Sequence, residues 1–399
     1  MSWIADSTTL AEFCQRAAAA PFVTVDTEFM RERTYWAQLC LVQCATPDEA
    51  VAIDALAPGI DLSPLFRLLD DPRVLKVFHA ARQDLEIFHH MTGKVPGPLF
   101  DTQVAAMVCG FGDAVSYETL AGQLAQVRID KSARFTDWAQ RPLSERQITY
   151  ALADVVHLKK IYVTLAQRLT ATNRASWLQE EMATLLDPAT YRMDPEEGWR
   201  RFKPRTAKPR LLAVLKEVAA WREREAQRRD VPRNRVIRDE TVMDIAGHAP
   251  SSIEDLARVR GLSRSFADGR LGEDLLAAVR RGLALPESEI PILPPQVDLP
   301  PGLGPVVELL KVILKMKCEE HGVATKLVAS TADLERIAAD DEAPVPALHG
   351  WRREVFGEAA LALKRGEIAL TLRGRKMQML SVKAAAAEPA RRPAAASGN

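Results

Sequence analysis

The sequence lacks the features that mark a secreted, membrane-spanning or strongly charged protein. Its 53 basic side chains balance 53 acidic ones, so the net charge by itself indicates no partner. No run of about eighteen apolar residues occurs, and the N-terminus lacks a basic region followed by an apolar core. The five cysteines are odd in number and include no C-x-x-C pair. We therefore expect a protein of the reducing cytoplasm that is neither exported nor membrane-bound.

A G-x-x-x-x-G-K-[ST] loop is also missing, which excludes a P-loop helicase. What the chain does have is length and core-forming side chains. Its 399 residues, of which 47% are hydrophobic, are enough for two or three folded domains. The composition is therefore that of a folded protein rather than a disordered one.

Secondary-structure signals divide the chain into a β-rich N-terminal part and a helical remainder. The runs "FVTVDTEF", "WAQLCLVQCA" and "AVAIDA" predict an antiparallel meander of three strands, and "VLKVFHA" predicts a fourth strand. Helical patterns flank the fourth strand, which is typical of an α/β domain with helices packed on the sheet. After about residue 200 helical periodicity takes over, so we expect a small helical bundle there.

A proline-rich stretch and two internal echoes mark the C-terminal half. "LPESEIPILPPQVDLPPGLGP" contains too much proline for a helix and predicts a linker. Beyond it, two segments resemble earlier ones in the same order: "ASTADLERI" echoes "PSSIEDLARV", and "GEAALALKRGEIAL" echoes "GEDLLAAVRRGLAL". Either the chain contains a second, diverged copy of the bundle, or the short matches arise by chance. The expected parts are 1–175 (α/β domain), 176–207 (connecting helical segment), 208–288 (helical bundle), 289–304 (linker), 305–380 (second bundle) and 381–399 (disordered tail).

Asp26 and Glu28 stand in the first predicted strand, whose apolar residues indicate a central position in the sheet. Alternate side chains of a strand share a face, so the two carboxylates project side by side. Burying unpaired carboxylates costs several kcal/mol, so a cation must compensate them. Arg31 and Arg33 could do so by salt bridges, and a divalent ion such as Mg²⁺ or Mn²⁺, which takes oxygen ligands, is the alternative. Spacing alone leaves both possibilities open.

Three further residues downstream have side chains suited to catalysis. Asp84 follows the fourth strand closely, at the start of a helical run. Tyr150 and Asp154 lie four residues apart on a predicted helix that begins with a capping box of Ser144 and Gln147. The phenol and the carboxylate therefore lie on the same face of that helix. Taken singly, each of the three also fits an ordinary solvated or core residue.

The order Asp-x-Glu, Asp84 in "HAARQD" and Tyr150-x-x-x-Asp154 resembles the DEDD exonuclease superfamily in its tyrosine subclass. "DTEFMRERTYWAQLCLVQ", "LFDTQVAAMV" and "DKSARFTDWAQRPLSERQITYALADV" are similar to the ribonuclease D family in particular, and residues 208–288 are similar to an HRDC domain. The resemblance implies an α/β exonuclease domain with a ribonuclease H-like mixed sheet flanked by helices, followed by two small all-α HRDC-type bundles. It implies these catalytic residues: Asp26, Glu28, Asp84, Tyr150 and Asp154.

The activity implied by the resemblance is a 3′-to-5′ exoribonuclease that trims tRNA precursors with 3′ extensions and releases 5′-mononucleotides. Two divalent ions, Mg²⁺ or Mn²⁺, would be held by the four carboxylates. Asp26 would bridge the ions, Glu28 and Asp154 would serve the water-activating ion, and Asp84 would serve the second. Tyr150 would hydrogen-bond the attacking water and orient it.

Local charge supports an RNA partner. From Arg200 to Arg238 there are fourteen Lys and Arg against four acidic residues, an excess of ten that would attract phosphates without reading sequence. A solvated helix face is the alternative. The second bundle has "VATKLVAS" where the first has "VPRNRVIR", so it has lost most of this charge. The arginines expected to bind RNA are Arg222, Arg229, Arg233 and Arg235.

Two other functions remain open from the sequence. A single-strand DNA 3′-5′ exonuclease would use the same five residues, because they specify the reaction and not the sugar. A non-catalytic RNA-binding protein on the same fold is the other, although the complete residue set argues against it. Four aromatic residues near the motifs could stack on terminal bases or belong to the core: Phe29, Tyr35, Phe135 and Trp138.

Overall fold

The computed structural model describes residues 2–130, 136–204, 206–293 and 300–382. These residues form two compact units, one from the described parts of 1–105 and 116–295 and the other from those of 106–115 and 296–399. Most of the tail expected to be disordered, residues 383–399, lies outside the described residues, as do 294–299 of the expected linker. None of the helices within the described ranges has the length and apolarity that a membrane crossing needs.

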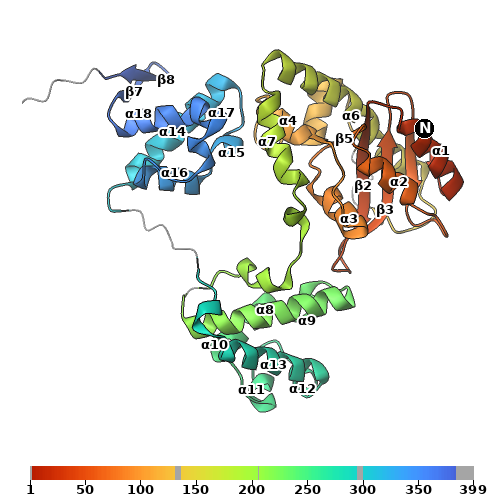
Figure 1. Cartoon of the computed structure of the whole chain (residues 1–399), viewed down its shortest axis with the longest axis vertical. Helices are drawn as coiled ribbons and strands as arrows, with labels where there is room; N and C mark the ends of the chain where they lie inside the picture. The colour runs from red at the N-terminus through yellow and green to blue at the C-terminus, as the bar shows by residue number, and fades with distance from the viewer. Residues whose placement is uncertain (1, 131–135, 205, 294–299, 383–399) are drawn as a thin grey trace, which may run out of the picture. The chain divides into compact units, whose positions relative to one another are not determined.

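A six-stranded mixed sheet forms the centre of the first unit (Figure 1). Its strand order is β1-β4-β3-β2-β5-β6, in which β2, β3 and β4 pair antiparallel and the other pairs are parallel. The predicted meander and the fourth strand, β5, are therefore confirmed. The strands β1 and β6 were not predicted, because three residues are too few to show alternation. The strand bounds are β1 Ser2–Ile4, β2 Phe22–Met30, β3 Gln38–Ala45, β4 Ala50–Asp54, β5 Leu75–Phe78 and β6 Leu99–Asp101.

Helices flank this sheet, and the longest of them, α6, packs on β2, β3 and β4. The contact is apolar: Val155, Leu152 and Ala151 of α6 share a core cluster with Leu41 of β3 and Ala52 of β4. Since α6 also carries Tyr150 and Asp154, the packing brings both toward the sheet. The helix bounds are α1 Ser7–Ala17, α2 Ser63–Asp70, α3 Arg82–Thr92, α4 Thr102–Val108, α5 Tyr117–Leu120, α6 Glu145–Ala171 and α7 Ala175–Leu186.

A helical bundle follows in the same unit, as the periodicity predicts (Figure 1). Its long helix α8 begins with Pro209 and ends at Arg229, just before Asp230 takes a left-handed conformation. Val214, Leu215 and Val218 of α8 belong to the buried core of the bundle. The helix bounds are α8 Pro209–Arg229, α9 Arg233–Val236, α10 Asp239–His248, α11 Ile253–Ala257, α12 Arg264–Ala267 and α13 Arg270–Ala284.

The second unit is mainly helical and ends in a β-hairpin that was not predicted. Ser330 caps α16 with Asp333 in a capping box, as Ser252 caps α11, so the first echo has a structural counterpart. Residues 305–380 were expected to be helical throughout, but β7 and β8 pair antiparallel around a turn with Gly374 at φ 64°. The bounds are α14 Gly304–His321, α15 Thr325–Val328, α16 Thr331–Ala339, α17 Gly350–Arg352, α18 Glu358–Lys364, β7 Ile368–Arg373 and β8 Lys376–Ser381.

Candidate active site

The register of the sheet places Asp26 and Glu28 on the face that α6 covers. Asp26 pairs with Gln43 and Glu28 pairs with Leu41 across the β2–β3 ladder. Leu41 belongs to the apolar cluster beneath α6, and cross-strand partners share a face, so the carboxylates point toward the same helix. On that face the hydroxyl of Thr24 donates a hydrogen bond to the carbonyl of Val155 at 2.9 Å, which ties the strand directly to α6.

Helix α6 begins where the sequence predicts. The backbone N–H of Gln147 donates to the side chain of Ser144 at 3.3 Å, and the Gln147 side chain accepts from the backbone of Ser144 at 2.9 Å, which completes the capping box. The box fixes where the helix begins, and the apolar residues that pack on the sheet fix which face of the helix points inward. Asp154 consequently faces the two carboxylates of β2, with Tyr150 one turn before it.

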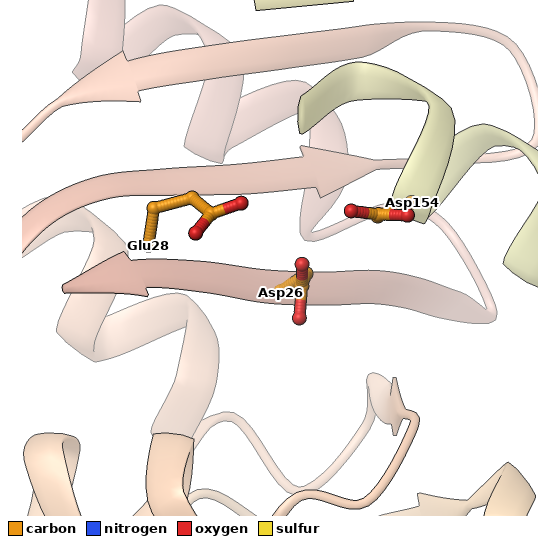
Figure 2. Close-up of side chains that lie close together, drawn as sticks. All are labelled: Asp26, Glu28 and Asp154. Carbon is orange, nitrogen blue, oxygen red and sulfur yellow. The ribbon is translucent and has the colours of Figure 1, made fainter. Parts of the chain in front are cut away.

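Three carboxylates gather at this point. Asp26, Glu28 and Asp154 each offer an oxygen atom, and these atoms all lie within 4.8 Å of one another. Figure 2 shows Asp26 and Glu28 on the strand and Asp154 reaching toward them from the helix. Carboxylate oxygens are the ligands that Mg²⁺ and Mn²⁺ prefer, so the chemistry of the donor set fits a divalent ion.

Burial raises the pKa of all three groups, and repulsion between carboxylates adds to it for Glu28 and Asp154. Burial raises the pKa of Asp26 to about 6. The pKa of Glu28 rises to about 9, first through burial and then through the charges of Asp26, Asp154 and Asp84. The pKa of Asp154 rises to about 8 through burial and the charge of Asp26. Without a cation the cluster therefore retains protons at neutral pH, and a bound divalent ion would favour the ionised form.

Among the residues that the structure describes, neither Arg31 nor Arg33 forms an ion pair with Asp26 or Glu28. Arg31 forms an ion pair with Glu86 of α3 at 2.5 Å, and Arg33 is exposed on the loop beyond β2. Arg33 nevertheless lines the same cavity as Glu28. Of the two alternatives, the contacts of the described residues favour a divalent ion.

Asp84 lies in the first turn of α3 and is buried beside β2. The hydroxyl of Thr27 donates a hydrogen bond to its carboxylate. Burial, and then the charge of Asp26, raises the pKa of Asp84 above its usual range. Asp84 is not one of the three carboxylates whose oxygens meet within 4.8 Å, although its charge reaches Glu28. The structure therefore groups three of the four predicted acids closely and places the fourth next to them.

Asp101 holds the turn that leads to Asp84, and sequence reasoning did not single it out. Its carboxylate accepts hydrogen bonds from the backbone N–H groups of Ala80 at 3.0 Å and Ala81 at 2.8 Å. Ala80 has φ 58°, a conformation that L residues adopt rarely, so the two bonds stabilise a strained turn. The sequence does contain one signal that could have pointed to Asp101: in "LFDTQ" it is an acidic residue at the end of a short strand, directly before a helix.

A cavity of about 320 Å³ opens beside the cluster, lined by Asp26, Tyr150 and Asp154 together with His79 and Tyr117. The Tyr117 hydroxyl donates to the backbone carbonyl of residue 153 at 3.0 Å, one residue before Asp154. Sequence reasoning did not single out Tyr117, because only the fold brings residues 117 and 153 together.

A second cavity of about 510 Å³ is lined by Glu28, Phe29, Thr34 and Trp138 among others. The cluster therefore borders two cavities, the first at Asp26 and Asp154 and the second at Glu28.

Only some of the four candidate aromatic residues are available for stacking. Tyr35 and Trp138 are 5% and 3% exposed and belong to buried clusters, so the core alternative holds for both. Trp138 packs near the ring of Tyr150, with centroids 6.1 Å apart. Phe29 lines the larger cavity, and Phe135 lies outside the described residues.

Burial also corrects the predicted RNA-binding arginines. Arg222 is 1% exposed and pairs with Asp239 at 2.6 Å, so the prediction that it contacts RNA is wrong for this arrangement. The guanidinium of Arg233 donates to Glu223 at 2.6 Å and to the Tyr35 hydroxyl at 2.8 Å.

Two of the four predicted arginines remain accessible. Arg235 is exposed, and Arg229 is partly exposed beside Glu225. The basic stretch is therefore partly an internal ion-pair network rather than a free surface.

Comparisons with known proteins identify relatives of this chain. A 3'-5' exonuclease family matches residues 1–170, and the HRDC domain family matches residues 212–279. A protein of Gluconacetobacter diazotrophicus named Ribonuclease D is 53% identical over 366 residues, 92% of this chain and 93% of its own. Its namesake in Nitrobacter hamburgensis is 53% identical over 372 residues, 93% of this chain and 97% of its own.

A solved structure is similar over almost the same length. The crystal structure of Escherichia coli RNase D, described as an exoribonuclease involved in structured RNA processing, matches with a TM-score of 0.77 and 31% sequence identity. The match covers 91% of this chain and 98% of that one. The similarity thus includes the exonuclease sheet, the HRDC bundle and most of the helical C-terminal region.

Proposed function

Because the chain belongs to the ribonuclease D family and is a metal-dependent 3′-to-5′ exoribonuclease, we propose that it trims the 3′ ends of tRNA precursors and releases 5′-mononucleotides. The observation that carries the proposal is the carboxylate cluster of Asp26, Glu28 and Asp154 on the covered face of the sheet. The description of the Escherichia coli enzyme as acting on structured RNA supports the substrate class.

The cofactors we propose are two divalent ions, Mg²⁺ or Mn²⁺. When bound, such ions activate water and stabilise the charge of the leaving 3′ oxygen. Asp26 is suited to contact both ions, because its charge raises the pKa of each of the other three carboxyl groups, Glu28, Asp84 and Asp154. Glu28 and Asp154 would complete one site, and Asp84, which lies apart from the close group, would serve the other.

Tyr150 would hydrogen-bond and orient the attacking water. It lines the cavity with Asp26 and Asp154, and the packing of Trp138 near its ring restricts its position. A phenol both donates and accepts hydrogen bonds, which suits positioning. The two cavities at the cluster would offer separate places for the last nucleotide and for the chain that precedes it.

We propose a cytoplasmic location, where tRNA precursors occur in bacteria. All five cysteines are buried and unpaired, which is consistent with a reducing compartment.

The decisive experiment compares nucleotide release from a 3′-extended tRNA precursor, a generic single-stranded RNA and a single-stranded DNA, each with Mg²⁺ and with Mn²⁺. We expect the tRNA precursor to be trimmed with release of 5′-mononucleotides. Faster release from DNA would favour the DNA exonuclease, and no release from any substrate would favour the non-catalytic alternative.

The site itself is tested by Asp26→Asn. This variant should lose metal-dependent release while it unfolds at a temperature no lower than the wild type, because it removes a charge that the fold buries at a cost. Asp48→Asn, which changes an exposed carboxylate beyond β3, is the matched control and should retain activity. Full activity of Asp26→Asn would contradict the assignment.

A further inference from the structure

Gln43 lies next to the carboxylate cluster with neither polar atom of its side chain hydrogen-bonded. The residue is 0% exposed. Within the described ranges, three buried side-chain nitrogen or oxygen atoms lack a partner, and two of them are Nε2 and Oε1 of Gln43. Buried polar groups are nearly always hydrogen-bonded, so an exception of this kind needs an explanation.

The register of the sheet places this carboxamide beside a predicted metal ligand. Gln43 is the direct cross-strand partner of Asp26 in the antiparallel β2–β3 pair. Such partners share a face with Cβ atoms about 5 Å apart, which is within reach of a glutamine side chain. That face is the one α6 covers and on which Glu28 and Asp154 converge.

Two other buried polar side chains on this face have partners. The hydroxyl of Thr24 donates to the carbonyl of Val155 at 2.9 Å, and Asp54 of β4 accepts from Arg141 at 2.6 Å. The partner of Gln43 on β4 is Ala52, an apolar member of the core cluster. An apolar side chain of the same length would fill this space without leaving polar atoms unpaired, so packing alone does not account for a glutamine here.

We propose that Gln43 is a positioning residue for Asp26: in the metal-loaded protein its Nε2–H donates to the Asp26 carboxylate and holds it in its ligand orientation. The inference rests on the proposed function, because it requires that the cluster binds divalent ions. An ionised carboxylate that binds a metal is an acceptor only, and an amide donor beside it fixes the orientation of its second oxygen.

The test is Gln43→Met, which keeps the length of the side chain and removes both polar atoms. Two quantities are measured: Mn²⁺ affinity by isothermal titration calorimetry, and the Tm in excess EDTA. We expect Mn²⁺ binding to weaken roughly 10- to 100-fold. The metal-free Tm should be equal to or above that of the wild type, because unsatisfied polar atoms leave the core. Gln43→Leu repeats the test with a second apolar side chain.

Val42→Ala is the matched control, since Val42 is the preceding residue of β3, equally buried, and its side chain points to the opposite face. It should lower the metal-free Tm and leave Mn²⁺ affinity unchanged.

Unchanged Mn²⁺ affinity in both Gln43 variants would overturn the inference alone. So would a weaker affinity accompanied by a fall in the metal-free Tm as large as that of Val42→Ala, because packing would then explain the loss. A wild-type protein that binds no Mn²⁺ would overturn the inference and the proposed metal site together.

Discussion

Replacing Glu28 with glutamine should stabilise the metal-free protein at neutral and alkaline pH. Burial, followed by the charges of Asp26, Asp154 and Asp84, raises the pKa of Glu28 from 4.5 to about 9. The folded state therefore keeps a proton that the unfolded chain releases, in the window between about pH 5 and pH 9. Within that window stability falls as the pH rises, and the loss is complete above the folded pKa.

The size of the effect follows from proton linkage. A difference of one bound proton changes the free energy of unfolding by about 1.4 kcal/mol per pH unit, so Glu28 alone contributes a fall of at most about 3 kcal/mol from pH 6 to pH 8. Because Glu28 is only partly buried and solvent screens it, we expect about 1–2 kcal/mol. Asp154, whose pKa rises to about 8, adds a contribution of the same sign.

Urea unfolding in excess EDTA at pH 6, 7 and 8 measures the effect. The free energy of unfolding of the wild type should fall over this range, and Glu28→Gln should reduce the slope. The exposed Glu32, four residues further on, provides the control, and Glu32→Gln should retain the wild-type slope. Saturating Mg²⁺ should reverse the trend in the wild type, since the ion binds the ionised carboxylates. Identical slopes for the wild type and Glu28→Gln would refute the reasoning.

Three further outcomes are expected. Tyr150→Phe should slow nucleotide release but keep Mn²⁺ affinity within about twofold, because the ring near Trp138 remains and only the hydroxyl is lost; an equal loss of affinity would contradict a positioning role. Arg141→Ala should lower the free energy of unfolding by about 2–4 kcal/mol in urea, as it leaves the buried Asp54 unpaired, and no change would contradict this. Arg235→Gln should reduce the salt dependence of RNA affinity by about one unit of slope, whereas an unchanged slope would place that phosphate contact elsewhere.

The salt dependence of RNA affinity is better tested by Arg235→Gln than by deletion of the whole segment 200–399. Tyr35, on the loop after β2, is buried in the core of the helical bundle, and its hydroxyl donates to Glu223. Its backbone N–H donates to Asp230 at 3.0 Å. Deletion would expose this surface and disturb the strand that carries Asp26, so a change in RNA binding could not be attributed to lost charge.

Local patterns predicted the elements that carry the site. The alternation in "VTVDTEF" predicted the strand with two carboxylates on one face, and the box of Ser144 and Gln147 predicted the start of α6. Both signals depend on backbone geometry within a few residues, so they can be read without knowledge of the fold. The hairpin β7–β8 was missed because a neighbouring echo of a helical segment suggested more helix.

The sequence by itself determined the identity and order of the motif residues, the strand and helix that hold them, and the resemblance to an exoribonuclease family. Only the tertiary structure decided which side chains meet and which are buried. It brings Asp154 to Asp26 and Glu28, places Gln43 unpaired beside them, and buries Arg222 in an ion pair. The physical reason is that strand register and helix packing join residues far apart in the chain, and a local pattern contains no information on that pairing.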